Sequence, residues 1–298
     1  MTRDVVASAE QRLGPALDVK HVLTAWWPCI LGFAALAIPT INTLSSQAWI
    51  RESGAHGPIV LVTGLWLLAR QLTAARAIAK PGALWLSALG LAVALVIYVF
   101  GRTFDFVSLE TLGLFGVGVA MLHSVFGVSA LLRNWFPFFY LGFAIPPPGW
   151  LIDKITAPLK QFVSEVAMRS LSSVGIPVSR QGVTIYVSKY QLLMEDACSG
   201  MNSLVGLTAI SLLYIYLLRG SSIRYSLLMT AFVIPIAIFG NILRVMILIL
   251  LTYFFGDEVA QGFLHYTAGF LLFAIDLMLV FAVDSILVRI VPRTWRPA

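Results

Sequence analysis

Long apolar runs separated by short polar stretches dominate the pattern along this chain. Eight of these runs can each be interpreted as a transmembrane helix, which takes about 20 apolar residues. They cover residues 22–41, 58–75, 83–101, 111–132, 134–152, 198–218, 225–255 and 266–288. The pattern therefore predicts an all-α polytopic membrane protein with about eight transmembrane helices. We expect residues 1–298 to form a single transmembrane domain.

Three of these runs need comment. Residues 146–148 are all proline and end the fifth run, because proline cannot continue a helix. The seventh run is too long for one straight crossing, so we expect Pro235 and Gly240 to kink it or its last turns to rise above the membrane. No cleavage site follows a short apolar core near the N-terminus, which predicts that 22–41 is a retained span rather than a signal peptide.

Residues 153–197 form the one long polar segment between predicted spans. Apolar residues recur in its first part at helical spacing with charged residues between them, which is typical of an amphipathic helix on a membrane surface. These apolar residues are Ile155, Leu159, Phe162 and Val166. Farther along, residues 183–187 and 190–194 flank Ser188-Lys189, and this arrangement predicts a β-hairpin. The hairpin either holds an extended peptide by strand addition or serves as a structural plug between helices.

The composition excludes an ordinary soluble domain. Hydrophobic residues make up 59% of the chain and charged residues only 11%, with a mean hydropathy of +0.89, whereas soluble domains are about 25% charged. The net charge of +6 does not indicate nucleic-acid binding, because the basic residues are scattered at the ends of apolar runs. Their distribution instead carries information on membrane topology.

Lys and Arg are strongly biased to one side of the predicted bundle. With eight spans both termini share a side, and most basic residues of the short loops and tails fall on it. These are Arg3, Arg12, Lys20, Arg70, Arg76, Lys80, Arg133, Arg219, Arg224, Arg289, Arg293 and Arg296. The short loops opposite contain only Arg51 and Arg102. Because basic loops stay in the cytoplasm, we expect cytoplasmic termini and an outer, periplasmic position for 153–197.

Cys198 stands where the long polar segment gives way to the sixth apolar run. The predicted topology places Cys29 near the opposite face, so the two cysteines are too far apart for a disulfide. An unpaired thiol facing an oxidising compartment is usually either avoided or used. Ser199 and Gly200 follow at the predicted helix start, where backbone amides can stabilise a thiolate and bind a developing oxyanion. We interpret Cys198 as a nucleophile; the alternative is a residue that only caps the span.

Two other ionisable residues fall at the same predicted depth. Arg244 lies about 28 Å along the seventh span, which runs outward, and His265 begins the last span from the outside. Asn241 shares a helix face with Arg244, which suits binding of a substrate carbonyl or an oxyanion, while His265 can act as general acid or base. The alternatives are an arginine that snorkels to the interface and an ordinary surface histidine. Asp276, three turns beyond His265 and roughly on the same face, either tunes the site or pairs within the bundle; we favour the structural role.

Three sequence blocks resemble the motifs of the exosortase/archaeosortase family. Residues 195–204 (EDACSGMNSL) resemble its cysteine motif, 241–244 (NILR) its arginine motif and 264–269 (LHYTAG) its histidine motif, in the family's order and spacing. The final histidine makes the chain more similar to bacterial exosortases than to the archaeal branch. The resemblance implies a catalytic set of Cys198, Arg244 and His265. It is consistent with supporting or substrate-binding roles for Asp196, Ser199, Gly200, Asn202 and Asn241.

The resemblance also implies an activity. Bacterial exosortases are thought to be inner-membrane transpeptidases for secreted proteins with a PEP-CTERM-type tail, which has a short Pro-rich motif, a transmembrane helix and a basic cluster. We expect the Cys198 thiolate to attack the scissile carbonyl at the periplasmic face and form a thioester, which an acceptor amine or hydroxyl, or water, resolves. A polysaccharide or a lipid is a possible acceptor. No cofactor is expected, and no metal, because one usable Cys and one usable His make a poor ligand set.

Two functions of other classes remain open. A polytopic transporter also buries polar residues, but it should show internal repeats and helices broken near the membrane midplane. A non-catalytic scaffold for exopolysaccharide export is the other alternative. Substituting Cys198 by alanine separates these functions, because only an enzyme loses its function entirely.

Overall fold

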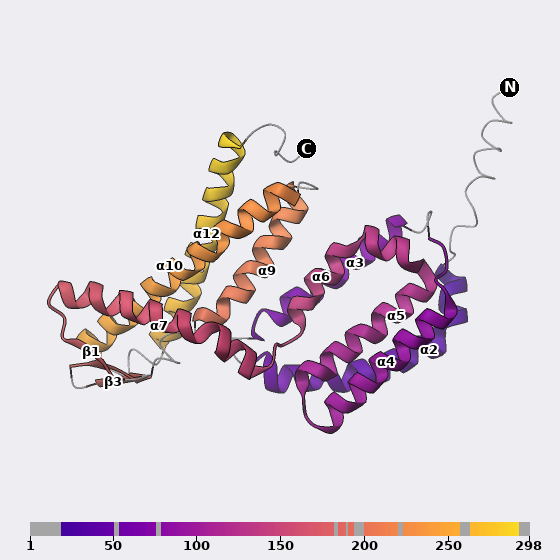
Figure 1. Cartoon of the computed structure of the whole chain (residues 1–298), viewed down its shortest axis with the longest axis horizontal. Helices are drawn as coiled ribbons and strands as arrows, with labels where there is room; N and C mark the ends of the chain where they lie inside the picture. Colours follow the sequence, from indigo (N-terminus) through magenta and orange to yellow (C-terminus); the bar gives the residue numbers. More distant parts are fainter. Residues whose placement is uncertain are drawn as a thin grey trace. The chain divides into compact units, whose positions relative to one another are not determined.

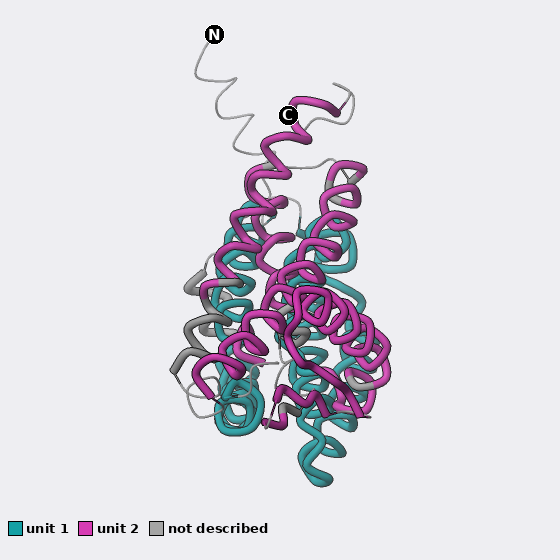
Figure 2. The backbone as a smooth tube through the Cα atoms, turned by 90° about the vertical axis from the view of Figure 1, so that its left-hand side faces the viewer, with its two compact units in different colours: residues 1–50, 57–146 teal, residues 51–56, 147–298 magenta. Residues whose placement is uncertain are grey.

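The computed structural model is largely helical (Figure 1). It describes residues 19–50, 54–75, 79–181, 184–188, 190–193, 200–219, 223–256 and 263–291. The chain divides into two compact units, the first made of residues 1–50 and 57–146 and the second of residues 51–56 and 147–298 (Figure 2). The all-α polytopic architecture expected from the sequence is confirmed.

Every predicted span contains a helix. Within the described ranges, five helices are long and apolar enough to cross a membrane, judged by length and composition: Trp26–Ala48, Gly57–Ala75, Leu84–Thr103, Val107–Arg133 and Leu227–Phe255. Two shorter apolar helices, Trp135–Ala144 and Val205–Leu218, lie in the fifth and sixth predicted spans. Hydropathy therefore located the helices well.

The fifth predicted span is not one continuous helix. Helix α6 (Trp135–Leu141) and the 3₁₀ turn η4 (Gly142–Ala144) together extend about 15 Å at 1.5 Å per residue. Residues 145–148 then leave the helix, because three of the four are proline. In extended form these four residues add about 13 Å. The short helix and the extended segment together therefore come close to the thickness of a bilayer core, about 30 Å, whereas the helix alone does not.

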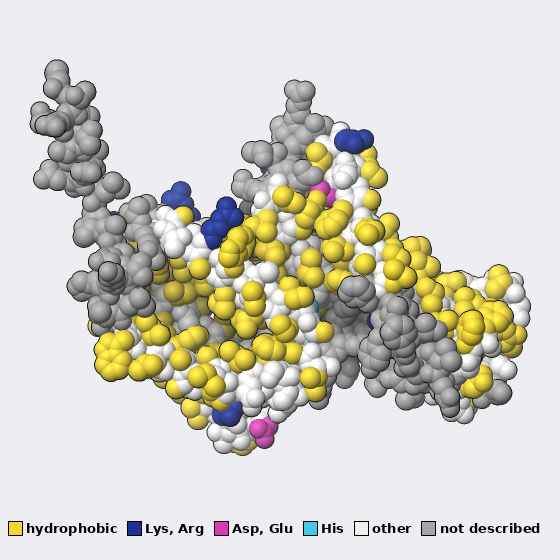
Figure 3. Space-filling view, turned by 180° about the vertical axis from the view of Figure 1, so that it is seen from behind, with side chains coloured by type: hydrophobic (Ala, Val, Ile, Leu, Met, Phe, Trp, Pro, Cys, Tyr) yellow, Lys and Arg dark blue, Asp and Glu magenta, His cyan; other side chains and the backbone are white. Residues whose placement is uncertain are grey.

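The first unit also contains α2 (Val19–Thr43), a π-helical turn η1 (Leu44–Ala48), α3 (Gly57–Ala75), α4 (Leu84–Thr103) and α5 (Val107–Arg133). Helices α4 and α5 pack closely because Gly113 lacks a side chain: a Cβ there would lie 2.5 Å from the backbone nitrogen of Tyr98. Large apolar side chains of α4, such as Leu89 and Val96, are exposed. Figure 3 shows many such hydrophobic side chains on the visible surface, as expected of faces that contact lipid.

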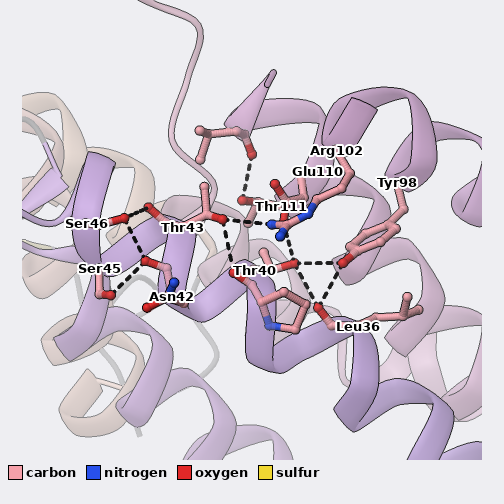
Figure 4. Close-up of polar contacts among 12 residues, drawn as sticks. Leu36, Thr40, Asn42, Thr43, Ser45, Ser46, Tyr98, Arg102, Glu110 and Thr111 are labelled. Carbon is pink, nitrogen blue, oxygen red and sulfur yellow. Dashed lines mark hydrogen bonds and ion pairs between the residues drawn. The ribbon is translucent and has the colours of Figure 1, made fainter. Parts of the chain in front are cut away.

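A buried carboxylate joins three helices of the first unit (Figure 4). Glu110 on α5 is 2% exposed and accepts hydrogen bonds from Thr40 of α2 at 2.8 Å and from Arg102 of α4 at 3.0 Å. The same Arg102 nitrogen also donates to Thr43 of α2 at 2.9 Å. Because Glu110 has both a cationic and a neutral donor, its burial is compensated.

The second unit combines four helices with a small sheet. Its helices are α7 (Gly149–Ser173), α9 (Gly200–Arg219), α10 (Ile223–Phe255) and α12 (Phe263–Ile290). Its strands are β1 (Val178–Gln181), β2 (Thr184–Val187) and β3 (Tyr190–Leu193), paired antiparallel in the order β1-β2-β3. The predicted amphipathic helix and hairpin are therefore present, as α7 and β2–β3.

The sheet contains one strand that the sequence pattern missed. Strand β1 pairs with β2 in the register Val178↔Val187, whereas β2 pairs with β3 in the register Val187↔Tyr190. Ile185 and Val187 of β2 are fully buried and pack with α7 and α10 in one apolar cluster. The sheet thus packs against the helices as the plug interpretation requires, while β3 is one of its two edge strands, as strand addition requires.

Of the four apolar residues that predicted α7, Leu159 packs against the protein core, but most of the core-facing residues of α7 are others. Val163, Ala167 and Leu171 recur every four residues and pack against α10 residues of the same apolar cluster. Ile155 and Phe162 are instead exposed. Helix α7 therefore has two apolar stripes, one for the protein core and one that suits a membrane surface.

Candidate functional site

The candidate residues map onto three helices that contact one another. Helices α9, α10 and α12 each contact the other two in the second unit (Figure 1). In the sequence, Cys198 precedes α9 by two residues. Arg244 lies in the later half of α10, and His265 is the third residue of α12.

Several predicted site residues fall where the structure is not described. Asp196, Cys198 and Ser199 lie outside the described residues. Gly200, Asn202 and His265 belong to described helices, at the start of α9 for the first two and of α12 for the last, but their side chains are outside the description. The mutual distances of Cys198, Arg244 and His265 therefore stay predictions. Asn241 and Arg244 are the predicted site residues whose side chains the structure describes.

One end of the three-helix bundle is fixed by a buried carboxylate and two tyrosines, Asp284, Tyr214 and Tyr225, which together we call the carboxylate clamp. Asp284 of α12 is fully buried, and its two oxygens accept hydrogen bonds from Tyr214 of α9 at 2.9 Å and from Tyr225 of α10 at 2.6 Å. Tyr214 lies near the end of α9, Tyr225 near the start of α10 and Asp284 near the end of α12. The starts of α9 and α12 and the later half of α10 therefore point to the opposite end of the bundle.

Helices α10 and α12 run antiparallel. At the clamped end the Tyr225 hydroxyl donates a hydrogen bond to Asp284, and farther along Gly240 of α10 lies against Asp276 of α12. The order of these contacts along α10 is the reverse of their order along α12.

The interior of the bundle becomes more polar along its length. Beyond the clamp, the buried core is mainly apolar, with Leu207, Val233, Ala237 and Val280. It also includes Ser211 of α9, whose hydroxyl has no hydrogen-bond partner among the described residues. One turn beyond Ala237, Asn241 is 4% exposed and Arg244 is 7% exposed. Neither polar atom of the Asn241 amide has a hydrogen-bond partner among the described residues.

This burial separates two interpretations of Arg244. A snorkelling arginine extends its charged head into water along a lipid-facing surface, whereas Arg244 is buried together with Val245, Leu248 and Ile249, the residues that follow it. Burial of a guanidinium in a membrane protein is costly and marks functional positions. With five donors and a fixed positive charge, it is suited to hold a substrate carbonyl as that carbonyl becomes an oxyanion.

Asn241 supplies both a donor and an acceptor on the same helix face. A buried amide without partners costs about 1–3 kcal/mol, so its presence favours a binding role over a packing role. Within the part of the chain that is described, no group of three or more His, Cys, Asp or Glu residues could hold a metal ion. The chemistry that these described residues support is recognition of a peptide group and stabilisation of negative charge.

Sequence reasoning missed the carboxylate clamp. Asp276 and Asp284 are eight residues apart on α12, so they lie close to one face of that helix. Two acidic residues in an apolar run are a signal in themselves, because membrane helices rarely carry them. Their partners come from other helices, 59 and 70 residues away for Asp284, and the sequence offers no means of choosing them.

Comparison with known protein families adds an independent finding. A family model described as transmembrane exosortase matches residues 49–282, which include the cysteine, arginine and histidine blocks. The chain belongs to the transmembrane exosortase family. Membership in this family supports a membrane transpeptidase that acts in protein sorting. No curated protein and no solved structure matches this exosortase.

Proposed function

We propose that this exosortase cleaves the C-terminal sorting signal of a secreted protein through a thioester on Cys198 and transfers the protein to an acceptor. The observation that carries the proposal is the buried pair of Asn241 and Arg244, in a bundle whose other two helices begin close in sequence to Cys198 and His265. Family membership supports the general activity. The charge bias of the loops supports a periplasmic site in a bacterial inner membrane.

Three side chains carry out the proposed reaction, and they account for every bond and proton in it. The Cys198 thiolate adds to the scissile carbonyl, and Arg244 stabilises the oxyanion of the tetrahedral intermediate. His265 donates a proton to the departing amine as the peptide C–N bond breaks, leaving a thioester. His265 then removes a proton from the acceptor amine or hydroxyl, whose attack breaks the C–S bond and restores the thiolate; water in the same position gives hydrolysis.

Strand β3 supports a site for the extended part of the sorting signal. It is one of the two edge strands of its sheet, the other being β1, and it ends at Leu193, five residues before Cys198 in the sequence. An edge strand presents backbone donors and acceptors that an extended peptide can pair with. A short Pro-rich motif is extended by nature, so this strand would guide it toward the thiol before the substrate's transmembrane helix begins.

Co-expression with a tailed substrate tests the proposal. The substrate carries a Pro-rich motif, a transmembrane helix and a basic cluster at its C-terminus, and intact mass spectrometry locates the cleavage site and any adduct. Wild type should release the tail, Cys198→Ala should leave it intact, and hydroxylamine should discharge a substrate thioester from wild type. Cys29→Ala is the matched control, because Cys29 is an exposed thiol of α2, and it should process normally. Normal processing by Cys198→Ala would refute the thioester mechanism and favour a transporter or scaffold.

A further inference from the structure

Three acidic side chains are buried in the described residues, and they differ in how they are compensated. Glu110 pairs with Arg102 and Thr40, and Asp284 accepts from two tyrosines. Asp276 is 9% exposed, yet its Oδ1 has no hydrogen-bond partner within the described ranges. A buried carboxylate that only joins helices is expected to be bonded as the other two are, so Asp276 calls for another explanation.

Gly240 fixes where the Asp276 carboxylate lies. A Cβ atom added at Gly240 would collide with both carboxylate oxygens, so the carboxylate occupies the space that any other residue would fill with its side chain. The glycine therefore admits a negative group directly against the backbone of α10. This contact is between α10 and α12, two helices of the same unit.

Arg244 lies one turn along α10 from this contact. Residues four apart share a helix face, and the step from Gly240 to Arg244 is about 6 Å along the axis. Long side chains in helices lean back toward the N-terminus, over residues three and four positions earlier. The Arg244 side chain therefore starts on the face of α10 against which the Asp276 carboxylate lies, and the two side chains form no ion pair with each other among the described residues.

We propose that Asp276 is a positioning residue that acts through Arg244. The proposal rests on the function proposed above and adds a fourth residue to it. The carboxylate attracts the guanidinium in a low-dielectric interior, where charges interact strongly, and so limits the orientations that the long side chain can take. A guanidinium held in place stabilises an oxyanion without reorganising during the reaction.

The decisive variant is Asp276→Asn, with Asp284→Asn as its matched control. Both replace a buried carboxylate of α12 by an amide of the same shape, but only Asp276 lies against Gly240, one helical turn from Arg244. The rate of thioester formation is measured in a single turnover with the tailed substrate, together with the melting temperature of the purified protein. Asp276→Asn should slow thioester formation roughly 10- to 100-fold, as loss of an orienting partner does elsewhere, and keep the wild-type melting temperature. Asp284→Asn should lower the melting temperature while the folded fraction reacts at the wild-type rate.

A double-mutant cycle tests whether Asp276 affects the rate through Arg244. Arg244→Lys keeps the charge but loses the fork of donors, and residues that act as a unit are non-additive. If Asp276 acts through Arg244, Asp276→Asn should change the rate less than about threefold in the Arg244→Lys background. Additive losses would overturn the proposal, as would a wild-type rate for Asp276→Asn in the Arg244-containing protein.

A second variant, Gly240→Ala, tests the proposal without changing Asp276 itself. Gly240→Ala keeps the carboxylate but displaces it from α10, and it should reproduce the rate loss of Asp276→Asn; a wild-type rate in folded Gly240→Ala would contradict the proposal. Failure of the proposed function is distinguishable, because the wild-type protein itself would then form no thioester. Wild-type thioester formation with no effect of either substitution would remove only the role of Asp276.

Discussion

At one end of the α9–α10–α12 bundle the Asp284 carboxylate accepts hydrogen bonds from two tyrosines, whereas farther along Asn241 and Asp276 carry polar atoms that no described residue satisfies. Both regions are buried, the first between α9, α10 and α12 and the second where α10 meets α12. Satisfied polar groups fix the helices relative to one another, and unsatisfied groups raise the energy of the folded protein. The comparison therefore assigns stability to the clamped end and chemistry to the other.

The first prediction removes the clamp. Asp284→Ala leaves the Tyr214 and Tyr225 hydroxyls without their carboxylate acceptor in a buried site. With about 1–3 kcal/mol for each unsatisfied group, the free energy of unfolding should fall by about 2–6 kcal/mol. Reversible unfolding in detergent measures this loss. Ser285→Ala is the control, since Ser285 is exposed and bonds only within its own helix, to the Phe281 carbonyl, and it should change the unfolding free energy little.

An unchanged stability for Asp284→Ala would show that the carboxylate contributes nothing to the bundle. The contrast between its two regions would then have no energetic basis. The assignment of Asp276 by comparison with Asp284 would lose its reference as well.

The second prediction reverses the sign of the stability change. Asn241→Leu removes a buried amide that no described residue satisfies and replaces it by an apolar group of similar size. The free energy of unfolding should stay equal or rise by about 1–3 kcal/mol, while processing of the tailed substrate should fall about a hundredfold, the loss typical of removing one oxyanion donor. Paired measurements of unfolding and of single-turnover rate test this trade of stability against activity.

The control for Asn241→Leu is Ala237→Leu, one turn earlier on the same face. Ala237 belongs to the apolar core, so the larger side chain should overpack the core and cost about 1–3 kcal/mol of stability. Destabilisation by Asn241→Leu, with activity kept in proportion to the folded fraction, would make Asn241 a structural residue and contradict its role in binding.

The sequence was sufficient to predict where the helices lie, but not which residues of different helices contact one another. Apolar runs of about 20 residues predict spans reliably because lipid leaves few alternatives for the backbone. In the fifth span the helix Trp135–Ala144 ends before residues 146–148, as the three prolines predicted, so the helix is shorter than the apolar run. Strand β1 was missed because its sequence, VSRQ, lacks the β-branched and aromatic alternation that revealed β2 and β3.

Periodicity also could not distinguish the two apolar faces of α7. In a soluble protein the apolar stripe marks the core, but at a membrane surface lipid accepts the same residues. Ile155 and Phe162 were therefore as visible in the sequence as Val163 and Ala167, although only the latter pair is buried. In the candidate site, helix spacing placed Asn241 and Arg244 on one face correctly, whereas the contact of Gly240 with Asp276 spans 36 residues of sequence and needs the folded chain.

The smallest predicted effect is the difference in stability contributed by the two tyrosine donors of the clamp. Tyr225 is fully buried and donates at 2.6 Å, whereas Tyr214 is partly buried and donates at 2.9 Å. Tyr225→Phe should therefore lower the free energy of unfolding by about 1.5 kcal/mol and Tyr214→Phe by about 0.5 kcal/mol, the two ends of the usual range for one hydrogen bond. Neither should alter the single-turnover rate of folded protein, because Tyr225 and Arg244 are separated by about 28 Å of α10. A rate loss without a stability loss in either variant would mean that the clamp controls the distant polar region, and the two ends of the bundle could no longer be treated as separate in function.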